Sequence, residues 1–174
     1  MSKVLLLILF LFQVSCADHS VLNYQDEEPK LSLRSFFNGE IYALGIVQDR
    51  SGVVIQRFKV DMIASWKDNV ATLDESFIYS DGTKSKRVWK LTEKEGSLYE
   101  GTAGDVDGKA RGEVLGNTFF FEYVLNVPVG ESVYRIKLED WMFLLDDNTL
   151  MARSYMSKWG FDVGEVTIVM MKRM

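Results

Sequence analysis

Residues 54–66 read VIQRFKVDMIASW, and this stretch decides the fold because its side chains alternate in character. One face carries mainly apolar residues: Val54, Phe58, Val60, Met62, Ala64 and Trp66. The other face carries polar ones: Arg57, Lys59, Asp61 and Ser65. A period of two residues is typical of a β-strand with one face in a core and the other in water. The stretch therefore predicts an amphipathic strand whose stripe from Phe58 to Trp66 points into the interior.

The same alternation recurs along the chain, for example over residues 119–127 and 134–142. Turn sequences such as SDGT (80–83) and LDDNT (145–149) separate the apolar stretches about every ten to fifteen residues. This spacing predicts an all-β domain of about eight to ten strands, a single antiparallel meander that closes into a barrel with a filled or ligand-sized interior. Helical turns are expected only within residues 16–29 or near Arg153–Gly160.

The composition is that of one ordinary globular domain. The chain has 174 residues, of which 47% are hydrophobic and 26% are charged. Its formal net charge is −5 at pH 7, so no basic surface is expected to attract phosphate groups. The sequence therefore argues against nucleic-acid binding.

The N-terminus has the layout of a secretory signal peptide. A positive start (Met1–Lys3) precedes an apolar run (Val4–Phe12) that is shorter than the roughly 20 residues of a membrane-spanning helix. The small residues before Cys16, the single cysteine, resemble the lipobox of bacterial lipoproteins, although Gln13 stands where leucine is usual. We expect residues 1–15 to be removed and Cys16 to carry acyl chains that bind the membrane. The alternative is a simple secretory cut near Ala17 that discards the cysteine.

Residues 16–29 are polar and acidic and end in Pro29, which predicts a flexible tether before a barrel domain at residues 30–174. His19, the single histidine, lies in this tether, and we expect it to be exposed and alone. The barrel domain therefore has no histidine for a Ser-His-Asp triad or a histidine-based zinc site.

No motif for a cofactor or a metal stands out. Residues 101–117 contain five glycines, but their spacing fits neither a phosphate-binding loop nor a dinucleotide fingerprint. We expect a strand pair in which glycine allows bends or close approach of other groups. Residues 146–148 lack the ligand pattern of a calcium loop and predict a hairpin turn. We therefore expect neither a cofactor nor a metal site.

Several charged residues fall on strand faces that are otherwise apolar. Glu75 shares a face with Phe77 and Tyr79, Arg87 shares one with Trp89, and Asp140 shares one with Leu138 and Met142. Because burying an unpaired ion costs several kcal/mol, Arg87 with Asp140 or Glu75 could be a structural ion pair. The functional alternative is that Arg87 binds the acidic head of an acyl ligand. In that case the candidate ligand-binding residues are Arg87, Trp89, Trp66, Phe121, Glu75 and Asp140.

Blocks of the sequence resemble, in order, a family of proteobacterial lipoproteins known as domain of unknown function 3833. The blocks include FFNGEIYALGIVQDRSG (36–52), RFKVDMIASW (57–66), LDESFIYSDGT (73–83), RVWKL (87–91), GTAGDVDGKARG (101–112), EDWMFLLDDNTLMARSYMSKWGF (139–161) and VGEVTI (163–168). The resemblance spans almost all of Leu31–Lys172. It implies export, a lipidated cysteine and a compact calycin-like or lipocalin-like barrel, but no particular activity.

Two classes of function remain open. The favoured one is a non-enzymatic binder or carrier of a lipid or small apolar ligand in the bacterial envelope. The alternative is an envelope hydrolase or isomerase that uses a carboxylate pair such as Glu75 and Asp140 as acid and base. Ala17 replaces the aspartate that commonly retains lipoproteins in the inner membrane, so we expect the outer membrane, facing the periplasm.

Overall fold

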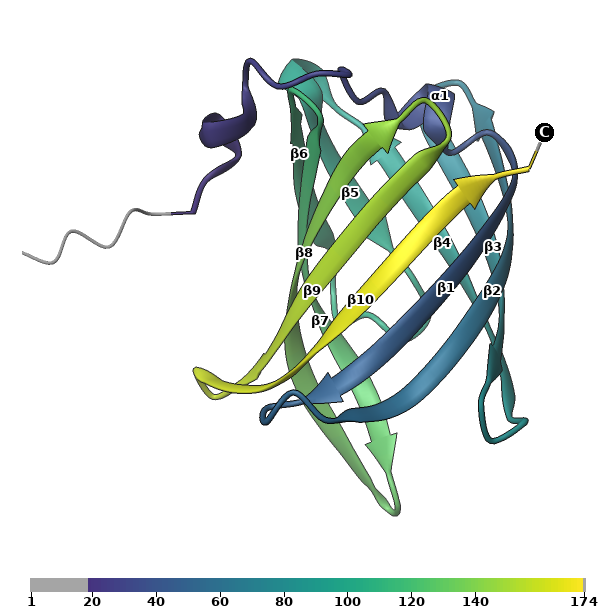
Figure 1. Ribbon diagram of the computed structural model, residues 1–174, viewed down its shortest axis with the longest axis vertical. Coiled ribbons are helices and arrows are strands. Elements are labelled where there is room, and N and C mark those ends of the chain that lie inside the picture. Colours follow the sequence, from purple (N-terminus) through teal and green to yellow (C-terminus); the bar gives the residue numbers. More distant parts are fainter. Residues whose placement is uncertain (1–18, 174) are drawn as a thin grey trace, which may run out of the picture.

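The computed structural model describes residues 19–173, and its main feature is a closed barrel of ten strands (Figure 1). The strands are β1 (Gly39–Asp49), β2 (Val54–Lys67), β3 (Val70–Tyr79), β4 (Lys84–Glu93), β5 (Leu98–Thr102), β6 (Ala110–Leu115), β7 (Thr118–Val129), β8 (Ser132–Asp146), β9 (Thr149–Lys158) and β10 (Phe161–Lys172). Each strand pairs antiparallel with its neighbours in the sequence, and β1 also pairs with β10. The predicted meander and its closure into a barrel are confirmed.

The stripe that predicted the fold points inward. Phe58, Val60, Met62 and Ala64 are all buried, and the register places Phe58 opposite Tyr79 and Val60 opposite Phe77. Val54 differs from the prediction, since 44% of its surface is exposed at the start of β2. The predicted inward face of β2 is therefore confirmed for residues 58–64, the part of the strand that faces the core.

One end of the barrel is closed by a short helix that the sequence did not predict. Helix α1 (Leu33–Phe36) begins after Ser32, whose hydroxyl accepts a hydrogen bond from the Ser35 amide. Leu33 and Phe36 are buried in the barrel core. Because a helix of one turn has too few residues to show a 3.6 period, pattern analysis misses it.

Residues that precede the barrel contact its outer wall. A 3-10 helix, η1 (Val21–Tyr24), confirms a helical turn in the predicted tether, and Val21 is buried. His19 is exposed but not alone, because its ring stacks on Trp141 with 3.7 Å between centroids. These apolar and aromatic contacts hold residues 19–24 against the wall, where a free tether was expected. Cys16 and the predicted signal peptide lie outside the described residues.

The prediction of a helical turn near Arg153–Gly160 is wrong. Residues 153–158 belong to β9, and Trp159 and Gly160 form the turn into β10. Polar Arg153, Ser154 and Ser157 obscured the strand, whose buried side chains are small. Within residues 19–173, no helix is both long enough and apolar enough to cross a membrane.

The glycines of residues 101–117 allow close packing, as predicted. A Cβ atom on Gly112 would lie 2.4 Å from a ring carbon of Phe119, and one on Gly101 would lie 2.6 Å from a ring carbon of Phe121. Both rings fill the barrel interior over these glycines. Residues 147 and 148 form the hairpin turn expected between β8 and β9.

The barrel wall is incomplete between β4 and β7. Strand β5 pairs with β4 only over Lys90–Glu93, and β6 pairs with β7 only over Arg111–Leu115, opposite residues 118–122. In the part of the chain that the structure describes, no strand adjoins residues 84–89 of β4 on this side. The loop at residues 103–109 lies in the gap, where Val106 pairs with Leu125. We call this gap, which the loop occupies, the slot. Asp105 in the loop lies 3.9 Å from the Arg87 guanidinium.

Candidate functional site

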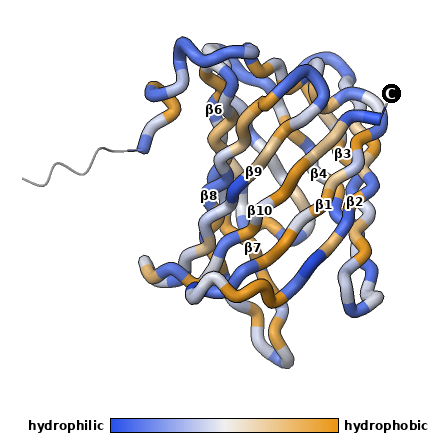
Figure 2. Tube along the Cα trace, in the orientation of Figure 1, coloured by the Kyte–Doolittle hydropathy of each residue, from blue (hydrophilic) through white to orange (hydrophobic). Residues whose placement is uncertain are grey.

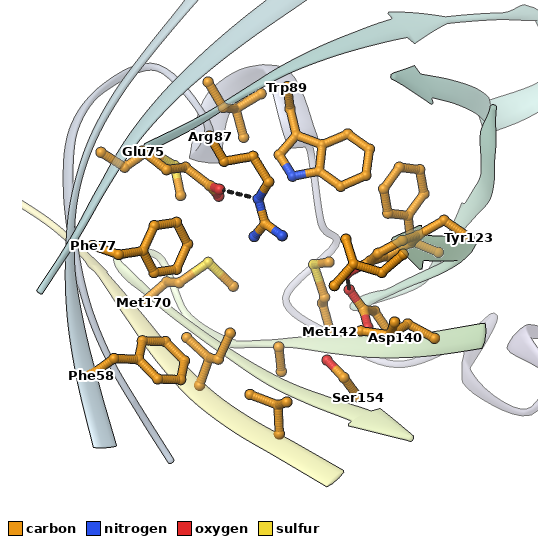
Figure 3. A pocket seen from close by; sticks show the side chains of 18 of the residues that line it. Phe58, Glu75, Phe77, Arg87, Trp89, Tyr123, Asp140, Met142, Ser154 and Met170 are labelled. Carbon is orange, nitrogen blue, oxygen red and sulfur yellow. Dashed lines mark hydrogen bonds and ion pairs between the residues drawn. The ribbon is translucent and has the colours of Figure 1, made fainter. Parts of the chain in front are cut away.

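The barrel encloses a cavity of about 380 Å³, within the range of small-molecule sites. Figure 3 shows apolar side chains from several strands around it, among them Phe58, Phe77, Trp89, Met142 and Met170. Well-packed interiors contain few voids larger than a water molecule. A void of this size therefore marks the interior as a candidate binding site.

An ion pair stands on one wall of the cavity. Glu75 and Arg87 lie directly opposite each other on β3 and β4, and Arg87 Nε donates to Glu75 Oε2 at 2.7 Å. The guanidinium also lies 5.2 Å from the Phe77 ring and 5.5 Å from the Trp89 ring. Its two terminal nitrogens point into the cavity (Figure 3). Arg87 therefore presents hydrogen-bond donors to any molecule that fills the space.

The environment keeps Arg87 charged. Burial works against its charge, but the ion pair with Glu75 raises the guanidinium pKa overall. Burial raises the pKa of Glu75, and the neighbouring Arg87 offsets part of that effect. Asp105, in the loop at the slot, adds a second carboxylate at 3.9 Å from the Arg87 guanidinium. Two acidic groups, Glu75 and Asp105, thus compensate the partly buried Arg87 cation.

A second polar group faces the cavity from β7, β8 and β9. The Tyr123 hydroxyl donates to Asp140 Oδ2 at 3.1 Å, and Ser154 lies opposite Asp140 in the register of β8 and β9. All three residues are buried. Asp140 Oδ1 has no hydrogen-bond partner among the described residues. Burial raises the Asp140 pKa to about 6, while Ser154, Tyr123 and Arg87 lower it in part.

Asp140 should make the stability of the barrel depend on pH. Its folded pKa of about 6 lies above its ordinary value of 3.8, so its contribution is fully present below the ordinary value and is lost as pH rises through 6. Between pH of about 4 and about 8 we expect a loss of about 2 to 3 kcal/mol from this group. Urea unfolding across this range measures it.

Asp140→Asn is the matched control for the pH series. The amide keeps an oxygen that accepts from Tyr123 but has no charge to bury, so this variant should lose less stability as pH rises. Equal pH dependence of the variant and the wild type would show that the Asp140 carboxyl is not responsible.

The structure brings together most of the residues that the sequence proposed. Arg87, Trp89, Phe121, Glu75 and Asp140 all line the cavity. Trp66 does not, because its indole Nε1 donates to the Phe37 carbonyl at 2.9 Å beside the closed end, and Arg34 covers its ring. Trp66 is therefore removed from the candidate site, and its role there is to fix α1.

Two polar residues of the cavity, Tyr123 and Ser154, are not among those predicted from the sequence. Tyr123 belongs to the mainly apolar alternation of residues 119–127, and Ser154 lies in the segment predicted to be helical. The signal for Ser154 was the alternation of Leu150, Ala152, Ser154 and Met156, all of which point inward in β9. The mixture of small and polar side chains hid that period.

Arg87 is the one basic residue among the described residues that line the cavity, and the other polar groups there limit its chemistry. Glu75 is already engaged by Arg87, so it is poorly available as a proton acceptor. Among residues 19–173, no group of three histidine, cysteine, aspartate or glutamate side chains is arranged to hold a metal ion. The arrangement fits recognition of a molecule that carries an acidic group and a large apolar part.

Comparisons with known proteins bear mainly on the fold. The S-type phycobiliprotein lyase CPES from Guillardia theta is similar in structure, with a TM-score of 0.58, 8% identity, and coverage of 79% of this chain and 88% of the lyase chain. A second structure, EF1p2_mFAP2b bound to DFHBI, has a TM-score of 0.44 and 10% identity, and the match covers 80% of this chain and 98% of that one. No curated protein matches the sequence. The first likeness confirms the predicted calycin-like barrel.

The family is established by sequence. The family model described as "Protein of unknown function (DUF3833)" matches residues 10–172, nearly the whole chain. This range includes every strand of the barrel and both polar groups of the cavity. The chain therefore belongs to the DUF3833 family.

Proposed function

We propose that the barrel binds one amphiphilic molecule, such as a fatty acid, with its apolar part in the cavity and its acidic group on Arg87. The observation that carries the proposal is the position of Arg87, a partly buried cation whose terminal nitrogens point into a mainly apolar cavity of about 380 Å³. A purely structural ion pair would be stabilised further by packing other side chains around it. The cavity instead leaves space beside the Arg87 guanidinium, and this space can hold the acidic head group of a ligand.

The slot between β4 and β7 supports the same function. The Arg87 side chain is 20% exposed and the Asp105 side chain 41%, so the head-group end of the cavity is reachable from solvent. An incoming carboxylate can take the place of the Asp105 contact at 3.9 Å while the pair with Glu75 stays intact. A phycobiliprotein lyase also has this fold, which supports a barrel that handles another molecule.

The enzyme alternative rests on Asp140, whose pKa of about 6 suits a general acid or base. It needs a second free carboxyl group, and Glu75 is bound to Arg87 at 2.7 Å. Binding without turnover is therefore the better-supported function.

Fluorescence titration tests the proposal with two matched ligands. A fluorescent fatty acid should bind the wild type, and the double variant Glu75→Leu with Arg87→Leu should bind it about tenfold more weakly or worse, the loss expected for a charge-assisted hydrogen bond. A fatty alcohol of the same length should bind both proteins alike, because it depends on the apolar walls. Failure of the wild type to bind either ligand, or equal fatty-acid affinity in both proteins, would contradict the proposal.

We also propose that the protein is an envelope lipoprotein, attached through acyl chains on Cys16 to the outer membrane and facing the periplasm. The signal-peptide layout of residues 1–15 and the single cysteine at the expected cleavage point support this location. One acyl chain gives only marginal membrane binding, whereas two or more make attachment stable.

Cys16→Ser should therefore move the protein from washed membranes to the soluble fraction. Cell fractionation with immunodetection measures the distribution, and Ser15→Ala, which leaves the thiol in place, is the control. Retention of a fully processed Cys16→Ser protein in washed membranes would contradict the acyl anchor.

A further inference from the structure

Exposed apolar residues occur on hairpins that lie at the end of the barrel opposite α1 (Figure 1; Figure 2 gives the hydropathy along the chain). They belong to three hairpins: Val53, Val54 and Ile55 to the β1–β2 hairpin, Val129, Val133 and Tyr134 to the β7–β8 hairpin, and Trp159, Phe161 and Val163 to the β9–β10 hairpin. The fourth hairpin at this end, between β3 and β4, consists of Ser80, Asp81, Gly82 and Thr83. We call the nine exposed apolar residues of the three hairpins the apolar rim. The rim does not extend over the polar β3–β4 hairpin, so it covers only one side of this end of the barrel.

Trp159 is the most informative residue of the apolar rim. It is 87% exposed, and its φ of +54° lies in the left-handed region, where a bulky side chain is strained. Asparagine or glycine would suit the turn before Gly160 better and would expose no apolar surface. Apart from the contact of its ring with Lys158, Trp159 is exposed, and the turn geometry does not call for a tryptophan at this position.

Lys158 indicates the chemistry of a partner for the apolar rim. Its ammonium lies 3.5 Å from the centre of the Tyr134 ring and 4.4 Å from the centre of the Trp159 ring. A cation held among aromatic rings, next to exposed Phe161 and valines, combines the groups that anchor proteins at a membrane surface. In membrane-surface proteins such aromatic rings sit at the level of the lipid head groups, and lysine contacts the phosphates.

We propose that the apolar rim docks on the surface of a lipid bilayer. The apolar side chains stand on separate protruding turns, which suits insertion between lipids, whereas a stable protein interface needs a continuous patch of about 800 Å² on each partner. In Figure 1 the described chain begins at the left of the barrel, the side toward which the β9–β10 hairpin also projects. Cys16, the proposed site of acylation, lies three residues before His19, and its acyl chains would enter the same bilayer.

Docking at the hairpin end would bring this end of the cavity next to the bilayer, which is the source of an amphiphilic ligand. Four side chains line the cavity toward the hairpins and are each partly exposed: Val47, Tyr79, Val127 and Met156. The opposite end is closed by α1. Entry of a ligand from the bilayer into the cavity rests on the proposed function. Docking of the apolar rim does not require a ligand in the cavity.

Quenching by brominated lipid tests the docking. The full chain is reconstituted into vesicles of phosphatidylethanolamine and phosphatidylglycerol that contain dibromo-phosphatidylcholine. Subtracting the signal of Trp159→Phe from that of the wild type isolates Trp159 from the other three tryptophans of the chain. We expect its emission to shift to shorter wavelength and to be quenched. The control adds Lys84→Trp to Trp159→Phe, which places the probe at the polar β3–β4 hairpin, and there we expect neither effect. Absence of quenching at Trp159, or equal quenching at both positions, overturns the proposal.

The double variant Trp159→Ser with Phe161→Ser separates this proposal from ligand binding. It should keep the fatty-acid affinity of the wild type, yet transfer the fluorescent fatty acid between vesicles about tenfold more slowly, since two apolar side chains no longer enter the bilayer. If the cavity binds no ligand, the quenching experiment still decides the docking. Wild-type transfer rates in the double variant would overturn the role of the rim.

Discussion

Arg87→Leu should lower the free energy of unfolding by about 3 to 5 kcal/mol at neutral pH, the usual cost of removing one partner of a buried ion pair. The substitution leaves Glu75, which is 7% exposed, in the apolar interior without the donor at 2.7 Å. The Glu75 pKa, already raised by burial, should rise further because Arg87 no longer lowers it. Since a raised carboxyl pKa means stability that is lost as pH rises, the deficit should be larger at high pH than at low pH.

The control is the double variant Glu75→Leu with Arg87→Leu, which removes both charges. Replacing a buried ion pair by apolar groups is often neutral or stabilising, so the double variant should recover most of the lost stability. Urea unfolding of the three proteins at several pH values measures this. If the single variant is as stable as the wild type at every pH, the Glu75–Arg87 pair is not the buried pair described above.

Phe121→Asp should abolish the folded barrel. Phe121 is 5% exposed, lies over Gly101, and contacts the rings of Trp89 and Phe119 at centroid distances of 5.3 and 5.1 Å. Losing the ring costs about 3 to 5 kcal/mol, and burying an unpaired carboxylate costs several more. The sum approaches the whole stability of a typical domain, about 5 to 15 kcal/mol.

Ile63→Asp is the control for that substitution. Ile63 is also in a strand, but it lies on the outer face of β2 and is 64% exposed, so the same change should cost little there. Circular dichroism and amide proton dispersion in NMR spectra distinguish a folded from an unfolded chain. A Phe121→Asp protein with the thermal midpoint of the wild type would contradict the assignment of this face to the core.

The proposed ligand chemistry and the apolar rim concern different parts of one barrel. The cavity needs Arg87 and its apolar walls, whereas the rim needs Trp159, Phe161 and Lys158 at the hairpin tips. Glu75→Leu with Arg87→Leu should therefore weaken fatty-acid binding, whereas Trp159→Ser with Phe161→Ser should slow transfer and leave that affinity unchanged.

Side-chain alternation in the sequence predicted most of the strands and their inward faces, but not the strand at residues 153–158 or the exposure of Val54. The alternation from Phe58 to Ala64 and from Phe119 to Val127 is a local property, since successive side chains of a strand point to opposite faces. Charges on the inward face could be read in the same way, which is why Glu75, Arg87 and Asp140 were candidates before the structure was known. The polar turn residues likewise marked the hairpins and, with them, the meander.

Only the tertiary structure decided how those faces meet. Which carboxylate pairs with Arg87 depends on the register of β3 and β4, and the sequence allowed both Glu75 and Asp140. The grouping of Tyr123 with Asp140 and Ser154 depends on the register of β7, β8 and β9. The slot between β4 and β7 depends on the short pairing of β5 and β6 with their neighbours. The separation of Trp66 from the cavity depends on its hydrogen bond to Phe37. Periodicity reports the direction of a side chain relative to its own strand, but contacts across a barrel depend on strand register, length and closure, which involve residues far apart in the chain.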